Sequence, residues 1–217
     1  NQVDLSKVQN LVVTQSHSDH LNAAEICFRL RELAAVIYEN EKKVFNIYGN
    51  KEVYNVIIDI IKKDPHVDMS RLKFHQINKF EKFSVEGLEF TPLKAYHKLD
   101  EEAFIFVIQD GKSTILYAND TGSLPDETLA FIEQQKYEFD VVSMDTCRGT
   151  INGDTHMGLQ ENIELRDKLT EMHAVSEYTQ YYLNHFSHMC GLIPQDYEKL
   201  VNRHGFNLTY DGLLVNV

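Results

Sequence analysis

Segments with helical hydrophobic periodicity alternate with short apolar runs along the chain. Between residues 22 and 39, apolar residues recur every three or four positions, which predicts a helix with one buried face. The same periodicity predicts further helices at 51–63, 125–135, 159–172 and 194–204. Short apolar runs next to turn-forming residues predict strands at 11–13, 44–48, 72–77, 88–95, 103–109, 113–117, 139–144, 180–183, 206–210 and 213–217. Because some strands are joined by hairpins and others by crossovers, the expected fold is a layered α/β structure with mixed sheets.

Length and composition allow one complete hydrophobic core. The chain has 217 residues, of which 43% are hydrophobic, and no repeat or long linker divides it, so a single domain over residues 1–217 is expected. No apolar stretch reaches the roughly 20 residues that span a bilayer, and no N-terminal segment of the sequence is ordered like a secretory signal. The three cysteines, Cys27, Cys147 and Cys190, are too few and too widely spaced for a disulfide framework. A cytoplasmic protein is expected.

The formal net charge of the chain is −12. Binding to nucleic acid usually rests on clustered lysine and arginine residues, so nucleic acid is not the expected partner. A small molecule is the expected substrate. The acidic balance does not exclude an anionic substrate, because bound cations would bring positive charge to a local pocket.

The segment from Gln15 to His20 contains three potential metal ligands, His17, Asp19 and His20, just after a predicted strand. Imidazole nitrogen and carboxylate oxygen suit zinc, manganese or iron. The alternative interpretation is a polar loop in which Asp19 or Asn22 caps the following helix. Short motifs also match by chance, so the metal interpretation depends on whether such residues recur along the chain.

Such residues do recur. His97, Asp120 and His185 each come directly after a predicted strand. Strand ends on one rim of a sheet can converge and assemble a site from distant residues. Taken singly, each residue has another explanation: a loop histidine, a turn or cap aspartate and, for His185 with His188, a pair of histidines beside aromatic residues. The metal interpretation therefore rests on the whole set.

The order of these residues resembles that of the metallo-β-lactamase fold hydrolases, over nearly the whole chain. That family has a His-x-His-x-Asp-His motif after a strand, then a lone histidine, a bridging aspartate and a final histidine. The resemblance implies an αββα sandwich with mixed β-sheets and a binuclear centre of divalent metal, with zinc or manganese expected and iron as a further option. The ligands that it implies are His17 and His97 for one ion, Asp19, His20 and His185 for the second, and Asp120 as the bridge.

Two features depart from the family pattern. Gln15 stands where the family has its first histidine, and an amide oxygen is a poorer ligand for a transition metal than imidazole. One metal site is therefore expected to be weak, vacant or filled by a harder ion such as manganese. The strands that family members carry before the first motif are also missing from the sequence. The chain is expected to be a fragment or to receive strands from another chain, as in a homodimer, because an exposed sheet edge invites pairing.

Several motifs resemble one branch of the family, the phosphoribosyl cyclic phosphate phosphodiesterases and related ribonuclease Z-like proteins. They are Tyr-Ala-Asn-Asp-Thr-Gly at 117–122, Thr-His-Met-Gly at 155–158 and Asn-His-Phe-Ser-His at 184–188. In that branch the residue that matches His156 lies near the active site, so His156 is expected to bind substrate. Asp145 and Arg148 are weaker candidates, because a strand-end aspartate and an exposed arginine are common.

The expected reaction is hydrolysis of a small cyclic or nucleotide-like phosphodiester. Two metals can clamp a phosphoryl oxygen and lower the pKa of a bridging water, and the resulting hydroxide is the expected nucleophile. Asp19 is expected to orient it and His188 to protonate the leaving oxygen. Two alternatives stay open. The same water activation suits a lactone or β-lactam carbonyl, and Gln15 is also compatible with a family member whose catalysis is impaired.

Overall fold

The computed structural model describes residues 7–31 and 43–217, which lie in two compact units. The first unit extends to Asn78 and the second begins at Lys79. This division does not test the expectation of a single domain, which stays a prediction. Within the described ranges, none of the helices combines the length and the apolar character that a membrane span requires.

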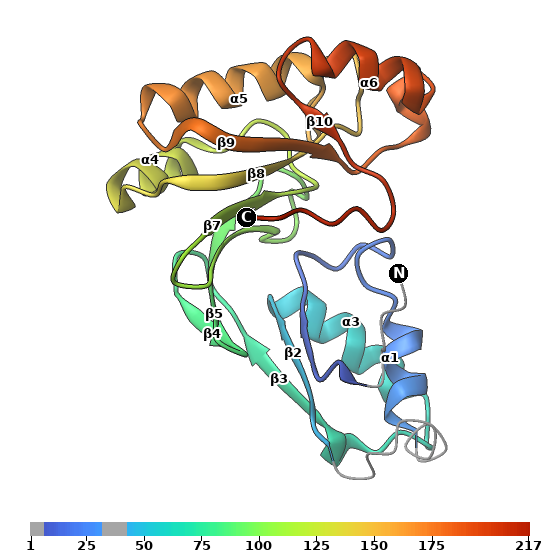
Figure 1. Ribbon diagram of the computed structural model, residues 1–217. Coiled ribbons are helices and arrows are strands. Elements are labelled where there is room, and N and C mark those ends of the chain that lie inside the picture. Colours follow the sequence, from blue (N-terminus) through green and yellow to red (C-terminus); the bar gives the residue numbers. More distant parts are fainter. Residues whose placement is uncertain (1–6, 32–42) are drawn as a thin grey trace. The chain divides into compact units, whose positions relative to one another are not determined.

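Parallel strands build the sheet of the first unit. β1 (Asn10–Val12), β2 (Phe45–Gly49) and β3 (Leu72–Gln76) lie in that order, and both pairs are parallel. Parallel neighbours need a crossover connection, and the helix α3 (Lys51–Ile61) forms the one between β2 and β3. The helix α1 (Ala23–Leu30) lies beside α3 (Figure 1).

Hydrophobic periodicity explains how this unit packs. Ile47 of β2 is fully buried, and α3 turns Val53, Ile57 and Ile61 toward the same apolar cluster. The residue before α3, Asn50, accepts a hydrogen bond from the Val53 N–H over 2.9 Å. Such a cap satisfies one of the N–H groups that a first helical turn leaves without a partner, and it fixes where the helix begins.

The second unit contains a seven-stranded mixed sheet in the order β10-β9-β8-β7-β6-β5-β4 (Figure 1). Neighbouring strands are antiparallel from β4 to β7 and parallel from β7 to β10. The strands are β4 (Phe83–Val85), β5 (Leu88–Lys94), β6 (Phe104–Gln109), β7 (Thr114–Ala118), β8 (Phe139–Asp145), β9 (Val175–Asn184) and β10 (Asn207–Leu208). Three helices, α4 (Asp126–Gln135), α5 (Leu159–Glu171) and α6 (Pro194–Asn202), connect the parallel strands in turn.

The strand directions place four strand ends at one edge of this sheet. β5 and β7 are both antiparallel to β6, so they run the same way, and β8 and β9 are parallel to β7. The carboxyl ends of β5, β7, β8 and β9 therefore lie at the same edge. The residues that end these strands or follow them include His97, Asp120, Asp145 and His185.

One face of the sheet packs on helices. Leu116 of β7 and Val142 and Met144 of β8 are fully buried in one cluster with Ile132 of α4 and Leu169 of α5. Side chains alternate between the faces of a strand. This packing therefore holds the register of β7 and β8 and, with it, the positions at which the two strands end.

The elements differ from the predicted ones mainly at the edges. The helix predicted at 22–39 is confirmed over α1, and its residues 32–39 lie outside the described residues. β9 begins five residues before the predicted strand, because its first half is exposed and polar and so lacks an apolar pattern. The short strand β4 and the 3-10 helices at Met69–Arg71 and His188–Cys190 were not predicted.

The prediction of a strand at 213–217 is wrong. The residues there are not in a strand, and β10 pairs with β9 over Asn207 and Leu208 alone. Beyond β10 the backbone carbonyl of Asn216 accepts a hydrogen bond from the Gln180 side chain over 3.1 Å. A side-chain contact of this kind does not extend the sheet.

Candidate metal centre

Asp120 follows β7 and has histidines on two sides. Its Oδ2 is 3.1 Å from Nε2 of His97, and its Oδ1 is 3.1 Å from Nδ1 of His156. Nε2 of His185 is 3.8 Å from Oδ1. The Asp120 side chain is only 2% exposed. Burying a carboxylate is costly unless charged or hydrogen-bonding groups compensate for the lost water, and here the histidine rings are the groups in place to do so.

Asp120 and His185 both adopt the left-handed backbone conformation, with φ of 57° and 59°. A residue that carries a β-carbon adopts it at a cost of about 1–2 kcal/mol. Strained residues of this kind cluster at functional sites, where the surrounding structure holds them in place. Both residues turn the chain directly after a strand of the second sheet, at the edge where the histidines gather.

Asp145 is the last residue of β8 and is fully buried. Its Oδ2 is 3.0 Å from Nδ1 of His156 and 3.3 Å from Nδ1 of His185. Its Oδ1 accepts a hydrogen bond from the Cys147 N–H over 2.7 Å. The Asn162 side chain, from α5, donates to the backbone carbonyl of Asp145 over 2.8 Å. The carboxylate is thus held in position and orients both imidazole rings.

Second partners fix the rings of His97 and His185. The Thr155 carbonyl can only accept, so Nδ1 of His97 is the donor across the 3.0 Å between them. His185 likewise directs Nδ1 at Asp145. In each ring the opposite nitrogen, Nε2, faces an oxygen of Asp120. Histidines that bind metals typically donate their other N–H to a carboxylate or a carbonyl in this way.

The donor set fits a divalent cation. One ligand atom from each of Asp120, Asp145, His156 and His185 lies within 4.8 Å of the others. Zinc bonds to nitrogen and oxygen at about 2.0–2.2 Å, so two ligands of one ion are expected a little over 3 Å apart. Mixed imidazole and carboxylate ligands suit zinc, iron or manganese, and they do not identify which of these the protein binds.

The same carboxylates govern protonation of the rings. Hydrogen bonds to Asp120 and Asp145 raise the pKa of His156 to about 10. The Asp145 carboxylate, 3.3 Å from Nδ1, also raises the pKa of His185, against the opposing effect of burial. The buried carboxylates thus favour a positive charge between them. A metal cation supplies such a charge, so its binding competes with protonation of these rings.

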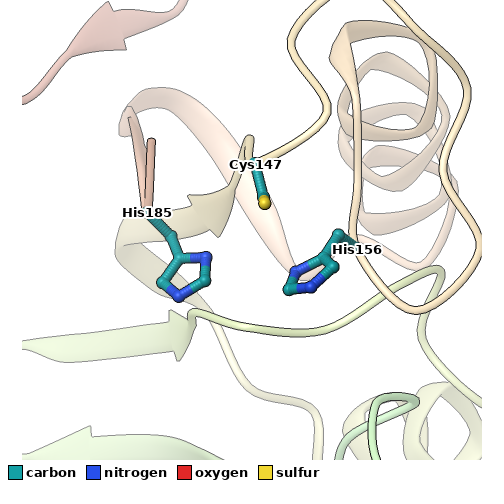
Figure 2. A group of neighbouring side chains, drawn as sticks. All are labelled: Cys147, His156 and His185. Carbon is teal, nitrogen blue, oxygen red and sulfur yellow. The ribbon is translucent and has the colours of Figure 1, made fainter. Parts of the chain in front are cut away.

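Figure 2 shows Cys147 with its sulfur beside the rings of His156 and His185. Its sulfur and one nitrogen of each ring lie within 4.8 Å of one another, and the residue is 3% exposed. The three cysteines are all free and buried. Because Nδ1 of both rings already faces Asp145, we regard Cys147 as a neighbour of the ligand cluster rather than one of its ligands.

The motif of the first unit forms the loop between β1 and α1. In that loop Nδ1 of His20 is 3.0 Å from the Thr14 hydroxyl, and its Nε2 is 3.6 Å from the Asp19 carboxylate. His17 is half-buried, whereas Gln15 is 1% exposed. The ligand roles of His17, Asp19 and His20, and the weakening of one site by Gln15, stay predictions.

The other predicted site residues lie in the second unit. His97, Asp120 and His185 lie close together with His156, which the sequence assigned to substrate binding. His188 lies exposed in the short 3-10 helix after β9 and is not a member of the clusters described above. Its role as a proton donor stays a prediction.

Asp145 was among the weaker candidates of the sequence analysis, and Thr155 and Glu161 were not assigned any role there. Asp145 ends an apolar strand, the same signal that identified Asp120. The carbonyl of Thr155, which orients His97, carries no sequence signal because any residue has one. Glu161 accepts hydrogen bonds from the N–H groups of Gly153 and Gly158, each over 2.9 Å. A glutamate three residues after the N-cap is half of a capping-box signature, but Gly158 lacks the Ser or Thr side chain of the other half, so the sequence carried only a partial signal.

Glu161 stabilises the loop that contains Thr155 and His156, because it accepts hydrogen bonds from both ends of that loop. Glu161→Gln keeps one carbonyl oxygen for two N–H groups, so we expect the free energy of unfolding to fall by about 1–3 kcal/mol. Because the loop also orients His97, we expect divalent metal affinity to fall by about tenfold. Thermal unfolding and competition with a chelating dye measure the two effects.

Glu164→Gln is the matched control, because Glu164 is exposed on the same helix. It should change neither quantity. If both variants have the metal affinity of the wild type, Glu161 stabilises only the start of α5 and does not contribute to the metal centre.

Comparison with known proteins identifies the family and the fold of the chain. The family model described as a β-lactamase superfamily domain matches residues 1–182. No curated protein matches the chain. Among solved structures, a diphosphatase from the PhnP family has a TM-score of 0.68 and 20% sequence identity, over 96% of this chain and 71% of that chain.

Two further solved structures have the same fold. The metallo-β-lactamase fold protein YhfI from Bacillus subtilis has a TM-score of 0.71 and 16% identity, over 97% of this chain and 79% of that chain. The short form of human tRNase Z has a TM-score of 0.64 and 12% identity, over 99% and 81%. Identities this low show the fold alone, whereas the family match covers most of the chain. The chain therefore belongs to the β-lactamase superfamily and is a metal-dependent hydrolase with the metallo-β-lactamase fold.

Proposed function

We propose that the protein is a phosphodiesterase that acts on a small cyclic or nucleotide-like phosphate. The observation that carries the proposal is the gathering of two buried carboxylates and three histidines at one edge of the second sheet. Burying two carboxylates lowers the stability of a fold unless a positive charge compensates for the lost hydration. A divalent cation would supply that charge.

From the family resemblance we assign His97, Asp120 and His185 to metal binding, and not the full set of Asp120, Asp145, His156 and His185 whose ligand atoms lie within 4.8 Å of one another. A divalent cation held there supplies Lewis acidity toward a phosphoryl oxygen and lowers the pKa of a water molecule. Asp145 has a positioning role, because it holds Nδ1 of His185 and leaves Nε2 for ligation. His156 lies between Asp120 and Asp145, beside the assigned ligands, and is the residue that we assign to binding the substrate phosphate.

The structural relatives support the choice of a phosphate ester. They include a diphosphatase from the PhnP family, a tRNase Z and the yeast protein PDE1, the last with a TM-score of 0.67 and 16% identity. The net charge of −12 favours a small substrate over a nucleic acid, because phosphate tracking needs clustered basic residues.

Metal removal and substrate comparison test the proposal. We expect chelation to abolish turnover of bis-p-nitrophenyl phosphate and added Zn²⁺ or Mn²⁺ to restore it. A chromogenic lactone and a cephalosporin should be hydrolysed much more slowly, if at all. Turnover of either carbonyl substrate without turnover of the phosphodiester would instead favour a lactone or β-lactam hydrolase.

The metal content and the activity of the same preparation also test the alternative that catalysis is impaired, which Gln15 suggests. Two metals per chain together with phosphodiester turnover would contradict that alternative. One metal and no turnover would support it, especially if Gln15→His restored both the second metal and activity.

A further inference from the structure

The side chains of Asn119, Ser143 and Asn184 form a hydrogen-bonded row across three neighbouring strands. The Asn184 amide donates to the Ser143 hydroxyl, and that hydroxyl donates to the side-chain carbonyl of Asn119 over 3.3 Å. Ser143 lies in β8, between β7 and β9, whereas Asn119 follows β7 and Asn184 ends β9. All three residues are half-buried. A single hydroxyl therefore connects the ends of the two strands on either side of β8.

This row lies directly behind the candidate metal centre in the chain. The residues that follow the two asparagines are Asp120 and His185, whose Oδ1 and Nε2 atoms are 3.8 Å apart. Ser143 comes two residues before Asp145 in β8, and alternate residues of a strand face the same side. Among the described residues, its side chain hydrogen-bonds to the two asparagines alone. The hydroxyl thus contacts the neighbours of the candidate ligands rather than the ligands.

The backbone at Asp120 and His185 needs support from surrounding contacts. Their φ angles of 57° and 59° belong to a conformation that residues with a β-carbon seldom adopt. In the part of the chain that the structure describes, Ser143 is the one hydrogen-bond partner of the Asn184 side chain, because Oδ1 of that amide is buried and has none. Loss of the hydroxyl therefore releases the side chain directly before His185.

We propose that Ser143 is a positioning residue, which sets the separation of Asp120 and His185 and with it the affinity of the protein for a divalent cation. The proposal rests on the ligand roles that these two residues have in the proposed function. Zinc bonds to nitrogen and oxygen at about 2.0–2.2 Å, so a small shift between two ligands lengthens a bond or distorts the geometry. Ser143 acts through the chain, in contrast to Asp145, which contacts the rings.

Removal of the hydroxyl tests this role. We expect Ser143→Ala to lower divalent-metal affinity by about tenfold, the lower end of the loss that is typical when a residue supporting metal ligands is removed. Competition with a chelating dye measures the affinity. Turnover of bis-p-nitrophenyl phosphate should fall at limiting metal and recover when Zn²⁺ or Mn²⁺ is raised. Asn184→Ala should weaken binding equally, and the two effects should not add in the double variant, because both substitutions break the same hydrogen bond.

A matched pair of variants separates the hydroxyl from packing. Ser143→Thr and Ser143→Val introduce side chains of the same shape, but only threonine has a hydroxyl. We expect Ser143→Thr to retain most of the wild-type metal affinity and Ser143→Val to resemble Ser143→Ala. Both residue types favour strands, so both variants should fold, which thermal unfolding checks. Ser176→Ala is the control and should leave metal affinity unchanged, because the Ser176 hydroxyl is exposed near the other end of β9 and accepts from the Tyr178 N–H over 3.2 Å.

Equal metal affinity of Ser143→Thr and Ser143→Val would overturn the proposal. Wild-type affinity in Ser143→Ala would do the same, as would fully additive effects of Ser143→Ala and Asn184→Ala. A wild type that binds the metal but hydrolyses no phosphodiester overturns the proposed function alone, since the dye competition still measures the role of Ser143. A wild type that binds no divalent metal overturns both.

Discussion

Replacing Asp120 with asparagine is expected to reduce turnover of bis-p-nitrophenyl phosphate by about a thousandfold or more. The carboxylate faces Nε2 of both His97 and His185, so its loss removes the negative charge that these rings share. The Lewis acidity of a bound metal contributes several kcal/mol to hydrolysis, and each 1.4 kcal/mol is about a factor of ten in rate. Kinetics and metal content, measured on the same preparation, check the prediction.

Asparagine is the right substitute because Asp120 has a φ of 57°. Asparagine tolerates this left-handed conformation better than alanine does, so the variant should keep its thermal unfolding temperature. An alanine at the same position would mix backbone strain with the loss of a ligand. Full activity in both Asp120→Asn and His97→Ala would contradict the roles assigned to these residues.

Replacing Asp145 with asparagine is expected to have a different signature. Asp145 orients His156 and His185 through Nδ1, and loss of an orienting group of this kind typically weakens metal affinity by about 10–100-fold. We therefore expect activity to fall at limiting metal and to recover in large part when Zn²⁺ or Mn²⁺ is raised. Asp120→Asn should not recover, because it replaces a carboxylate that we assign as a metal ligand with a neutral amide. Activity titrated against free metal concentration separates the two cases.

Asp140→Asn is the matched control for Asp145→Asn. Asp140 is exposed on the same strand and accepts a hydrogen bond from the Thr114 N–H at the opposite end of β8. It should change neither metal affinity nor activity. If Asp145→Asn shows wild-type metal affinity while remaining folded, the carboxylate does not orient the histidines in the way that the distances indicate.

Local patterns were sufficient to predict most of the helices and strands. The buried strands β6, β7 and β8 and the helices α3, α4 and α5 begin and end close to their predicted limits, because each combines a continuous apolar pattern with a turn or a cap. The prediction was wrong at 213–217, where an apolar pattern exists without a partner strand. Apolar residues can favour a strand, but hydrogen bonds to a neighbour are needed to form one.

The residues of the candidate site also divide into those that a local sequence pattern reveals and those that it does not. His97, Asp120 and His185 could be named from the sequence, because each follows a strand and the set resembles a family motif. Asp145 was a weaker candidate, since one strand-end aspartate looks like any other until its distances to His156 and His185 are known. Thr155 contacts His97 through its backbone carbonyl, so its part in the site could not be read from residue type.

By itself, the sequence determined the class of fold, the alternation of elements and the kinds of ligand available, because these follow from periodicity, turn chemistry and the acid–base character of side chains. Only the tertiary structure decided that the ends of β5, β7, β8 and β9 lie at one edge, since that depends on the hydrogen-bonded order and direction of strands far apart in the chain. It also decided which ring nitrogen of each histidine faces a carboxylate, because distances of about 3 Å are set by packing and not by spacing along the chain.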